Sequence, residues 1–247
     1  MPTLLKNWKI SSFHSTKLAS PPQRVAARPL AWLLAAILLA FPAFPAFGQG
    51  PTPGTGKTTA KPTDTVLIVG DSLSAEYGLK RGTGWVPLLQ KQLANEKNAT
   101  RVVNASISGD TTSGGRSRLA ALLGQHKPTV VVLELGGNDA LRGLPLEMTK
   151  NNLTAMTQAA KKAGAKVLLI GMQVPPNYGG AYAATFSGLF DKVAAAEKVA
   201  LVPFFLAGIA DVNDATTRFQ ADRIHPNEAS QPKMLANVWP ELKKLIQ

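Results

Sequence analysis

The chain has 247 residues, of which 45% are hydrophobic, so it can bury the core of one domain of ordinary size. It carries 27 Lys and Arg against 15 Asp and Glu, a formal net charge of +12. No cysteine is present, which excludes disulfides, thiolate metal sites, a cysteine nucleophile and a lipid-modified cysteine anchor.

Residues 1–48 have the pattern of an export signal. They contain five basic residues and no acidic residue, and an apolar run at 30–40 leads into alternating Phe, Pro and Ala. Ala46 and Gly48 supply the small residues that cleavage after Gly48 requires, and two nearby prolines disfavour a continuous membrane helix. We therefore expect a cleaved signal peptide rather than an uncleaved anchor, and a periplasmic or secreted protein without a stable membrane span. Because the basic part is long for a leader, a translation start near Val25 is a second hypothesis.

Residues 49–63 are rich in Pro, Gly and Thr and lack apolar periodicity, so we expect a flexible linker. Gly56-Lys57-Thr58 resembles the end of a phosphate-binding loop, but Pro51 stands where that motif needs glycine and no strand precedes it. Without the five basic residues of the leader, the formal charge of +12 falls to +7. The remaining basic residues are not interleaved with aromatic ones, which favours a solvated basic surface over nucleic-acid binding.

From residue 64 onward, short runs of branched apolar residues alternate with helical patterns. Buried strands are expected at 65–69, 101–105, 129–135, 166–172 and 199–205. Helices are expected at 84–95, 115–124, 146–163, 181–197 and 227–246. Because a helix fills each crossover, we predict one α/β domain, residues 64–247, built on a parallel sheet that is covered on both faces. The active site of such a sheet lies beyond the carboxyl ends of its strands.

Polar residues follow three of the predicted strands, and a fourth group precedes the last helix. The groups are Gly70-Asp71-Ser72, Gly109-Asp110-Thr111, Gly136-Gly137-Asn138-Asp139 and Asp222-Arg223-Ile224-His225. The spacing of Asp222 and His225 can bring the carboxylate to Nδ1 of the ring, which leaves Nε2 free to take a proton from a serine. His14 lies in the leader, and we interpret His126 as a helix-terminal residue.

These four blocks resemble those of the SGNH (GDSL) hydrolases, above all the bacterial arylesterase, thioesterase I and lysophospholipase L1 group. The segments 141–144, 175–178 and 225–227 also recur there in similar form. The resemblance covers residues 65–246 and implies a flavodoxin-like, three-layer α/β/α sandwich with strand order 2-1-3-4-5. It implies a hydrolase of acyl esters or thioesters, including lysophospholipids, that requires no metal or organic cofactor.

The same resemblance assigns roles to individual residues. It implies that Ser72 is the nucleophile, His225 the general base and acid, and Asp222 the partner that orients the imidazole. The oxyanion hole would consist of the backbone N–H groups of Ser72 and Gly109 and the side-chain amide of Asn138. Glycine suits position 109 because it lets the backbone approach the intermediate closely. A neutral amide suits position 138 because it donates a hydrogen bond without adding charge.

Several alternatives stay open at the level of sequence. A carbohydrate acetylesterase and a non-catalytic periplasmic binding protein are the rival functions, and the complete nucleophile and base pair argues against the binding protein. Glu76 stands where relatives carry a small residue, and we favour an i, i+4 pair with Lys80 over a contact with substrate. Segment 175–178 either lines an acyl pocket or forms a rigid turn, and Arg142 either contacts a head group or is solvated. The sequence does not indicate an oligomeric state.

Overall fold

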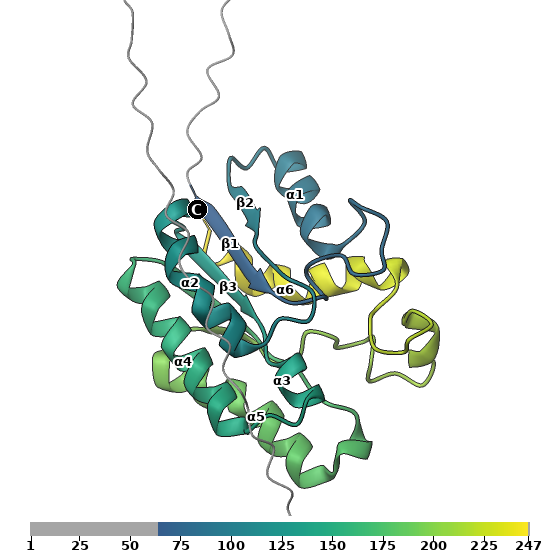
Figure 1. Ribbon diagram of the computed structural model, residues 1–247. Helices are drawn as coiled ribbons and strands as arrows, with labels where there is room; N and C mark the ends of the chain where they lie inside the picture. The colour runs from purple at the N-terminus through teal and green to yellow at the C-terminus, as the bar shows by residue number, and fades with distance from the viewer. Residues whose placement is uncertain (1–63, 247) are drawn as a thin grey trace, which may run out of the picture. The chain divides into compact units, whose positions relative to one another are not determined.

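The computed structural model describes residues 64–246, and the predicted signal peptide and linker lie outside them (Figure 1). Five parallel strands form one sheet in the order β2-β1-β3-β4-β5. The strands are β1 (Thr65–Gly70), β2 (Arg101–Asn104), β3 (Val130–Glu134), β4 (Lys166–Ile170) and β5 (Ala200–Val202). This confirms the predicted order 2-1-3-4-5.

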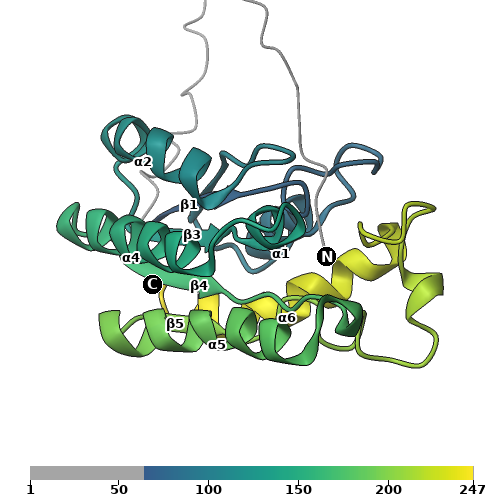
Figure 2. The same ribbon diagram turned by 60° about the horizontal axis from the view of Figure 1, so that its bottom comes forward.

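Helices cover both faces of the sheet. The helices are α1 (Trp85–Asn95), α2 (Thr112–His126), α3 (Gly137–Leu141), α4 (Leu146–Lys162), α5 (Gly180–Glu197) and α6 (Gln231–Lys243), with 3₁₀ turns η1 (Pro176–Tyr178), η2 (Ala215–Arg218) and η3 (Glu228–Ser230). Helix α1 packs against α6, and α4 packs against both α2 and α5, so one group lies on each face (Figures 1 and 2). The three-layer sandwich is therefore confirmed. Among residues 64–246, no helix is both long and apolar enough to cross a bilayer.

The register of the central strands determines where the site can form. Strands β1 and β3 are apolar on both faces and buried, as a parallel sheet between two helical layers requires. Gly70 pairs with Glu134 at their carboxyl ends. Both strands therefore end at the same level, and residues 71–72 emerge beside residues 135–138.

Several bounds differ from the prediction, among them those of α2, which runs from Thr112 to His126 instead of 115–124. Strand β5 ends at Val202 instead of residue 205, because Pro203 has no N–H to continue the ladder. Helix α6 begins at Gln231 instead of residue 227, with Pro232 in its first turn, where a missing N–H costs nothing. The five-residue helix α3 was not expected, because Gly-Gly-Asn-Asp is typical of a turn.

Candidate active site

The segment after β1 forms a tight turn around Ser72. Glu134 Oε2, at the end of β3, accepts hydrogen bonds from the backbone N–H of Asp71 at 3.2 Å and from Ser74 Oγ at 2.7 Å. Ser74 Oγ also accepts from the indole N–H of Trp85 at 3.1 Å. The turn that carries Ser72 is thus tied on both sides of that residue to a strand and a helix of the core, while Ser72 itself stays partly exposed.

A side chain from the C-terminal part of the chain reaches this turn. His225 Nε2 lies 2.9 Å from Ser72 Oγ, although the two residues are 153 positions apart. His225 Nδ1 lies 2.6 Å from Asp222 Oδ2, and Asp222 Oδ1 accepts from the backbone N–H groups of Ile224 at 3.0 Å and His225 at 3.1 Å. The three side chains form a continuous chain from hydroxyl to imidazole to carboxylate.

The loop that carries His225 is held by contacts of its own. Phe219 and Pro226 form an isolated antiparallel bridge, and the Gln220 backbone N–H donates to the His225 carbonyl at 2.8 Å. The Gln220 side chain donates to the carbonyl of Tyr77 at 2.9 Å, and the Tyr77 ring lies 4.5 Å from the imidazole, centroid to centroid. These contacts fix the loop to the segment that follows Ser72.

The electrostatic surroundings keep Asp222 ionised. Desolvation acts to raise its pKa, but the hydrogen bonds from Ile224 and from the ring and backbone of His225 outweigh it and lower the pKa to about 2. A carboxylate at Nδ1 holds the imidazole in the tautomer whose Nε2 accepts a proton. The Ser72 hydroxyl is the group in contact with that nitrogen.

The segments that hold Gly109 and Asn138 meet at the same edge of the sheet. Asn138 Nδ2 donates to Asp71 Oδ2 at 3.0 Å, next to Ser72 in sequence. Gly109 has φ +78°, a left-handed conformation that favours glycine, and its carbonyl accepts from the Arg142 guanidinium at 2.7 Å. Since Arg142 directly follows α3, one short helix contacts both the Ser72 turn and the Gly109 loop.

The buried side chain of Asp139 holds α3 in place. Its fully buried carboxylate accepts from the Thr112 backbone N–H at 2.8 Å, from the Thr112 hydroxyl, and from Thr149 Oγ1 at 3.2 Å. Thr112 begins α2, three residues after Gly109. The carboxylate therefore couples the position of Asn138 to that of the Gly109 loop.

Two buried carboxyl groups lie behind the Ser72 turn. Burial raises the pKa of Asp71, and hydrogen bonds from Leu73 and Asn138 only partly offset this effect. Burial also raises the pKa of Glu134 well above its usual value, and the Asp71 charge raises it further. The charge on one carboxyl group therefore opposes ionisation of the other.

Exposed apolar side chains lie at the end of the sheet that carries Ser72. Five large hydrophobic side chains are exposed in the described chain, namely Tyr77, Ile107, Leu141, Tyr178 and Ile224. Each lies in or beside a segment that follows a strand, so each belongs to the edge that carries Ser72. A surface of this kind can receive an apolar group from a substrate.

Ser72, His225 and Asp222 lie in direct contact, and two other interpretations change. The Glu76 carboxylate accepts from the backbone N–H groups of Gly82 at 2.9 Å and Gly84 at 2.8 Å, so the predicted pair with Lys80 is wrong. Residues 71–79 form turns rather than a helix, which removes the i, i+4 geometry. Arg142 bonds a backbone carbonyl and is not simply solvated. His126 ends α2, as expected.

Sequence reasoning missed Glu134, Tyr77 and the anchoring role of Asp139. A lone acidic residue at the end of the apolar strand Val-Val-Val-Leu-Glu is a usable signal, since a buried carboxyl group needs partners. Tyr77 carries no comparable signal, because an exposed aromatic residue in a turn has many explanations. No group of three potential metal ligands converges among residues 64–246.

Comparisons with known proteins agree with this geometry. Residues 68–231 match the model of the GDSL-like Lipase/Acylhydrolase family. Esterase TesA of Pseudomonas aeruginosa is 57% identical over 182 residues, which span 74% of this chain and 89% of that protein. Thioesterase 1/protease 1/lysophospholipase L1 of Escherichia coli strain K12 is 42% identical over 187 residues, 76% of this chain and 87% of that protein.

Solved structures give the same result. A crystal structure of TesA, 56% identical, has a TM-score of 0.71 and covers 74% of this chain and 99% of its own. The psychrotrophic esterase EstA from Pseudoalteromonas, inhibited by monoethylphosphonate, is 41% identical with a TM-score of 0.69, covering 73% of this chain and 97% of its own. The chain therefore belongs to the GDSL-like lipase and acylhydrolase family of SGNH serine hydrolases, which act on carboxylic esters and thioesters.

Proposed function

We propose that this chain hydrolyses acyl esters and thioesters through an acyl-enzyme on Ser72. The observation that carries the proposal is the contact of Ser72 Oγ with His225 Nε2 at 2.9 Å, continued by His225 Nδ1 to Asp222 at 2.6 Å. This is the geometry that general-base activation of a serine needs.

The reaction follows from these positions. Ser72 Oγ attacks the acyl carbonyl while His225 Nε2 takes its proton, and the resulting imidazolium gives that proton to the leaving alcohol or thiol. Water then attacks the acyl-enzyme by the same route, which releases the carboxylic acid. The backbone N–H groups of Ser72 and Gly109 and the amide of Asn138 are our candidates for stabilising the oxyanion.

The substrate range is inferred from the relatives and the site. TesA is named an esterase, and the E. coli relative a thioesterase and lysophospholipase. The exposed Ile107, Leu141 and Tyr178 offer an open apolar rim suited to an acyl chain. We assign aryl and alkyl esters, acyl thioesters and lysophospholipids as the substrate class.

Labelling with a fluorophosphonate probe tests the proposal. Wild-type protein is expected to react at Ser72, and Ser72→Ala to remain unlabelled and to lose turnover of p-nitrophenyl butyrate by several orders of magnitude. Ser113→Ala, at an exposed position in the first turn of α2, is the matched control and keeps both properties. An unlabelled wild-type protein would instead support a binding protein.

A substrate series separates the esterase from a carbohydrate acetylesterase. p-Nitrophenyl esters from acetate to palmitate, an acyl-CoA series and acetylated polysaccharides are compared on one preparation. We expect turnover to extend beyond acetyl esters, because the apolar rim is exposed. Activity confined to acetyl groups would favour the carbohydrate enzyme.

We also propose that the protein is exported. The support is the basic and apolar pattern of residues 1–48, together with the similarity of the chain to enzymes of two bacteria, E. coli and P. aeruginosa. Mass spectrometry of the protein from the periplasm is expected to find an N-terminus at Gln49. A cytoplasmic protein that retains residues 1–48 would contradict export.

A further inference from the structure

The net charge of the described domain is concentrated at one end of the molecule. We call this end the basic pole. It comprises the last turns of α1, α2, α4, α5 and α6, the connections that follow them, the first residues of β2, β3, β4 and β5, and Asp64 before β1. Its nine basic residues are Lys97, Arg101, Lys127, Lys161, Lys162, Lys166, Lys198, Lys243 and Lys244, and its four acidic residues are Asp64, Glu96, Glu197 and Glu241. The other eleven basic and eleven acidic residues of 64–246 balance each other.

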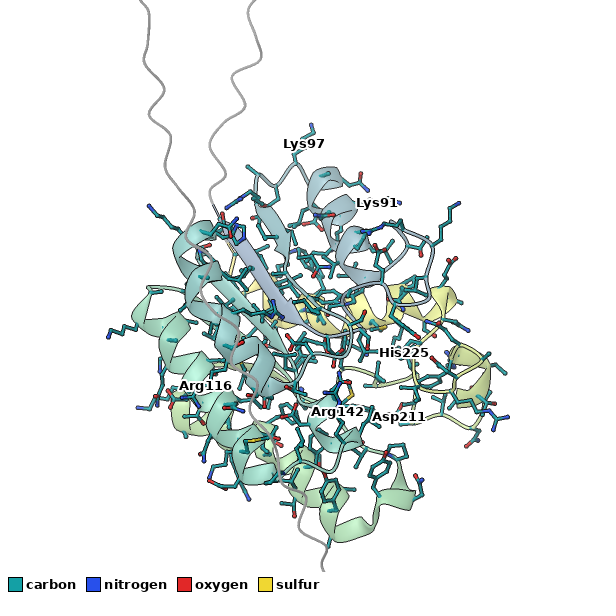
Figure 3. All side chains as sticks on the ribbon, viewed as in Figure 1. Lys91, Lys97, Arg116, Arg142, Asp211 and His225 are labelled. Carbon is teal, nitrogen blue, oxygen red and sulfur yellow. The ribbon has the colours of Figure 1, made fainter. Side chains whose placement is uncertain are left out.

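The basic pole lies at the opposite end of the sheet from the active site. Parallel strands start at the pole and end at the Ser72 turn, so the sheet separates the two. Figure 3 shows Lys97 at the top of the domain, well away from His225 and Arg142, which lie near the middle of that view. A partner bound to the pole would leave the catalytic edge open to water.

Three lysines of the pole occupy backbone positions that disfavour them. Lys97, Lys127 and Lys198 follow α1, α2 and α5 with φ of 54°, 44° and 54°. After α4 the left-handed position is held by Gly164, at φ 85°. Residues with a Cβ are strained in this region, whereas glycine is not. The favourable interaction of a cation with a helix C-terminus offsets part of that strain, so local stability gives lysine no clear advantage over glycine.

What these lysines do provide is outward-facing charge. All three are exposed, and within residues 64–246 none of their side chains makes an ion pair or hydrogen bond. They precede β2, β3 and β5, so they span the sheet from one edge strand to the other. Such a spread suits a broad anionic surface better than one small anion.

We propose that the basic pole binds the surface of an anionic phospholipid bilayer and turns the active site away from the membrane. The choice of a bilayer among anionic surfaces rests on the export proposed above. Residues 49–63, which remain after the proposed cleavage, join the domain at Asp64, within the pole, and contain Lys57 and Lys61 but no acidic residue.

Vesicle sedimentation tests the proposal on the protein as it is purified from cells. Wild-type protein is expected to bind vesicles of equal parts phosphatidylglycerol and phosphatidylcholine at low salt, to release them as salt rises, and not to bind phosphatidylcholine alone. Each lysine near an anionic surface changes affinity by about fivefold, so K97G/K127G/K198G should bind about 100-fold more weakly. Turnover of p-nitrophenyl butyrate stays unchanged in this variant, since the three lysines lie away from the site.

Matched variants separate charge from folding. K150Q/K192Q/K233Q removes the same charge outside the pole and is expected to bind within about threefold of wild type. K97R/K127R/K198R keeps the charge and should bind like wild type, and K97N/K127N/K198N, which tolerates a positive φ, should lose binding like the glycine variant. Thermal melts verify that each variant is folded.

Two outcomes would overturn the proposal. One is equal loss of vesicle binding in K97G/K127G/K198G and in K150Q/K192Q/K233Q. This result would mean that binding depends only on the total charge of the protein and not on the basic pole. The other is binding of duplex DNA as tight as that of vesicles at the same salt concentration, which would show an unselective attraction to polyanions. Neither outcome would affect the proposed hydrolase, whose test is labelling of Ser72.

Discussion

The carboxylate of Asp222 makes one hydrogen bond to the imidazole, which we propose is catalytic, and two to backbone N–H groups that hold it in place. The backbone N–H groups of Ile224 and His225 bind one oxygen, so the other is aimed at the imidazole. Because the pKa of Asp222 is lowered to about 2, the group stays ionised at every pH at which the protein would be assayed. Asp222 itself therefore adds no pH dependence to activity near neutrality.

Asp222→Asn should lower kcat by about 10⁴-fold with little change in KM. An amide can present N–H to Nδ1 and so favours the tautomer that cannot accept the Ser72 proton. The loss is measured as the pH profile of kcat on p-nitrophenyl butyrate, and it should persist across the neutral range. Asp214→Asn, an exposed residue of the same loop paired with Arg218, is the control and should keep wild-type rates. Recovery of Asp222→Asn to near-normal rates at any neutral pH would contradict the assignment.

Asn138→Ala should cost about 3 kcal/mol of transition-state stabilisation, or about two orders of magnitude in kcat. The reason is the loss of one neutral donor to the developing oxyanion. Because Asn138 also donates to Asp71, urea unfolding must accompany the kinetics. A variant that unfolds like wild type but hydrolyses esters at nearly the normal rate would remove Asn138 from the oxyanion hole. Asn95→Ala, at the exposed end of α1, serves as the control.

At the scale of elements, the end of β1 depends on the absence of a side chain at position 70. A Cβ on Gly70 would lie 2.6 Å from Glu134 Oε2 and 2.9 Å from both Ser74 Oγ and Ser106 Oγ. These oxygens fill the space that any larger residue needs. The Ser72 turn can therefore pack on β3 only because residue 70 is glycine.

Gly70→Ala should destabilise the fold by about 1–3 kcal/mol and lower kcat, because the turn must shift to relieve the overlap. Urea midpoints and p-nitrophenyl butyrate kinetics measure the two effects. Gly124→Ala, in α2 with open space where its Cβ would lie, is the matched control and should be neutral or gain about 0.5–1 kcal/mol from helix propensity. Equal stability of the two variants would show that the Gly70 contacts do not constrain the turn.

The elements also show what the sequence could predict. Strands β1 and β3 are continuous apolar runs, and the polar blocks after them follow directly in sequence, so both the sheet and the edge that bears Ser72 were predictable. Helix α3 was not, since its five residues Gly-Asn-Asp-Ala-Leu have no amphipathic repeat and depend on the tertiary bonds of Asp139. Likewise, the partners of Glu76 are backbone N–H groups of a turn, which no side-chain pattern encodes.

At the scale of the whole molecule, the parallel sheet gathers residues that are far apart in the chain. Strand order 2-1-3-4-5 places β1 and β3 side by side, which brings the Ser72 turn against Glu134 and Asn138. The loop after β5 then returns across this edge and delivers His225. The resulting site contains two buried carboxyl groups, Asp71 and Glu134, that the whole fold must keep out of water.

Glu134 should make the stability of the protein depend on pH, and the sign follows from its pKa. The native pKa is raised above the usual value of 4.5 by burial and by Asp71, so above pH 4.5 the native state holds a proton that the unfolded state has lost. The free energy of unfolding therefore falls as pH rises through this window.

Glu134→Gln keeps the acceptor oxygen for Asp71 and Ser74 but cannot titrate. Its free energy of unfolding, relative to wild type, should increase steadily as pH rises from about 4.5 toward neutrality. Urea midpoints at a series of pH values measure the difference. Glu147→Gln, an exposed glutamate paired with Lys150, should instead run parallel to wild type. A constant difference between Glu134→Gln and wild type over this range would mean that Glu134 is ionised in the native protein. The Ser72 turn would then be bound to a carboxylate rather than to a neutral acid.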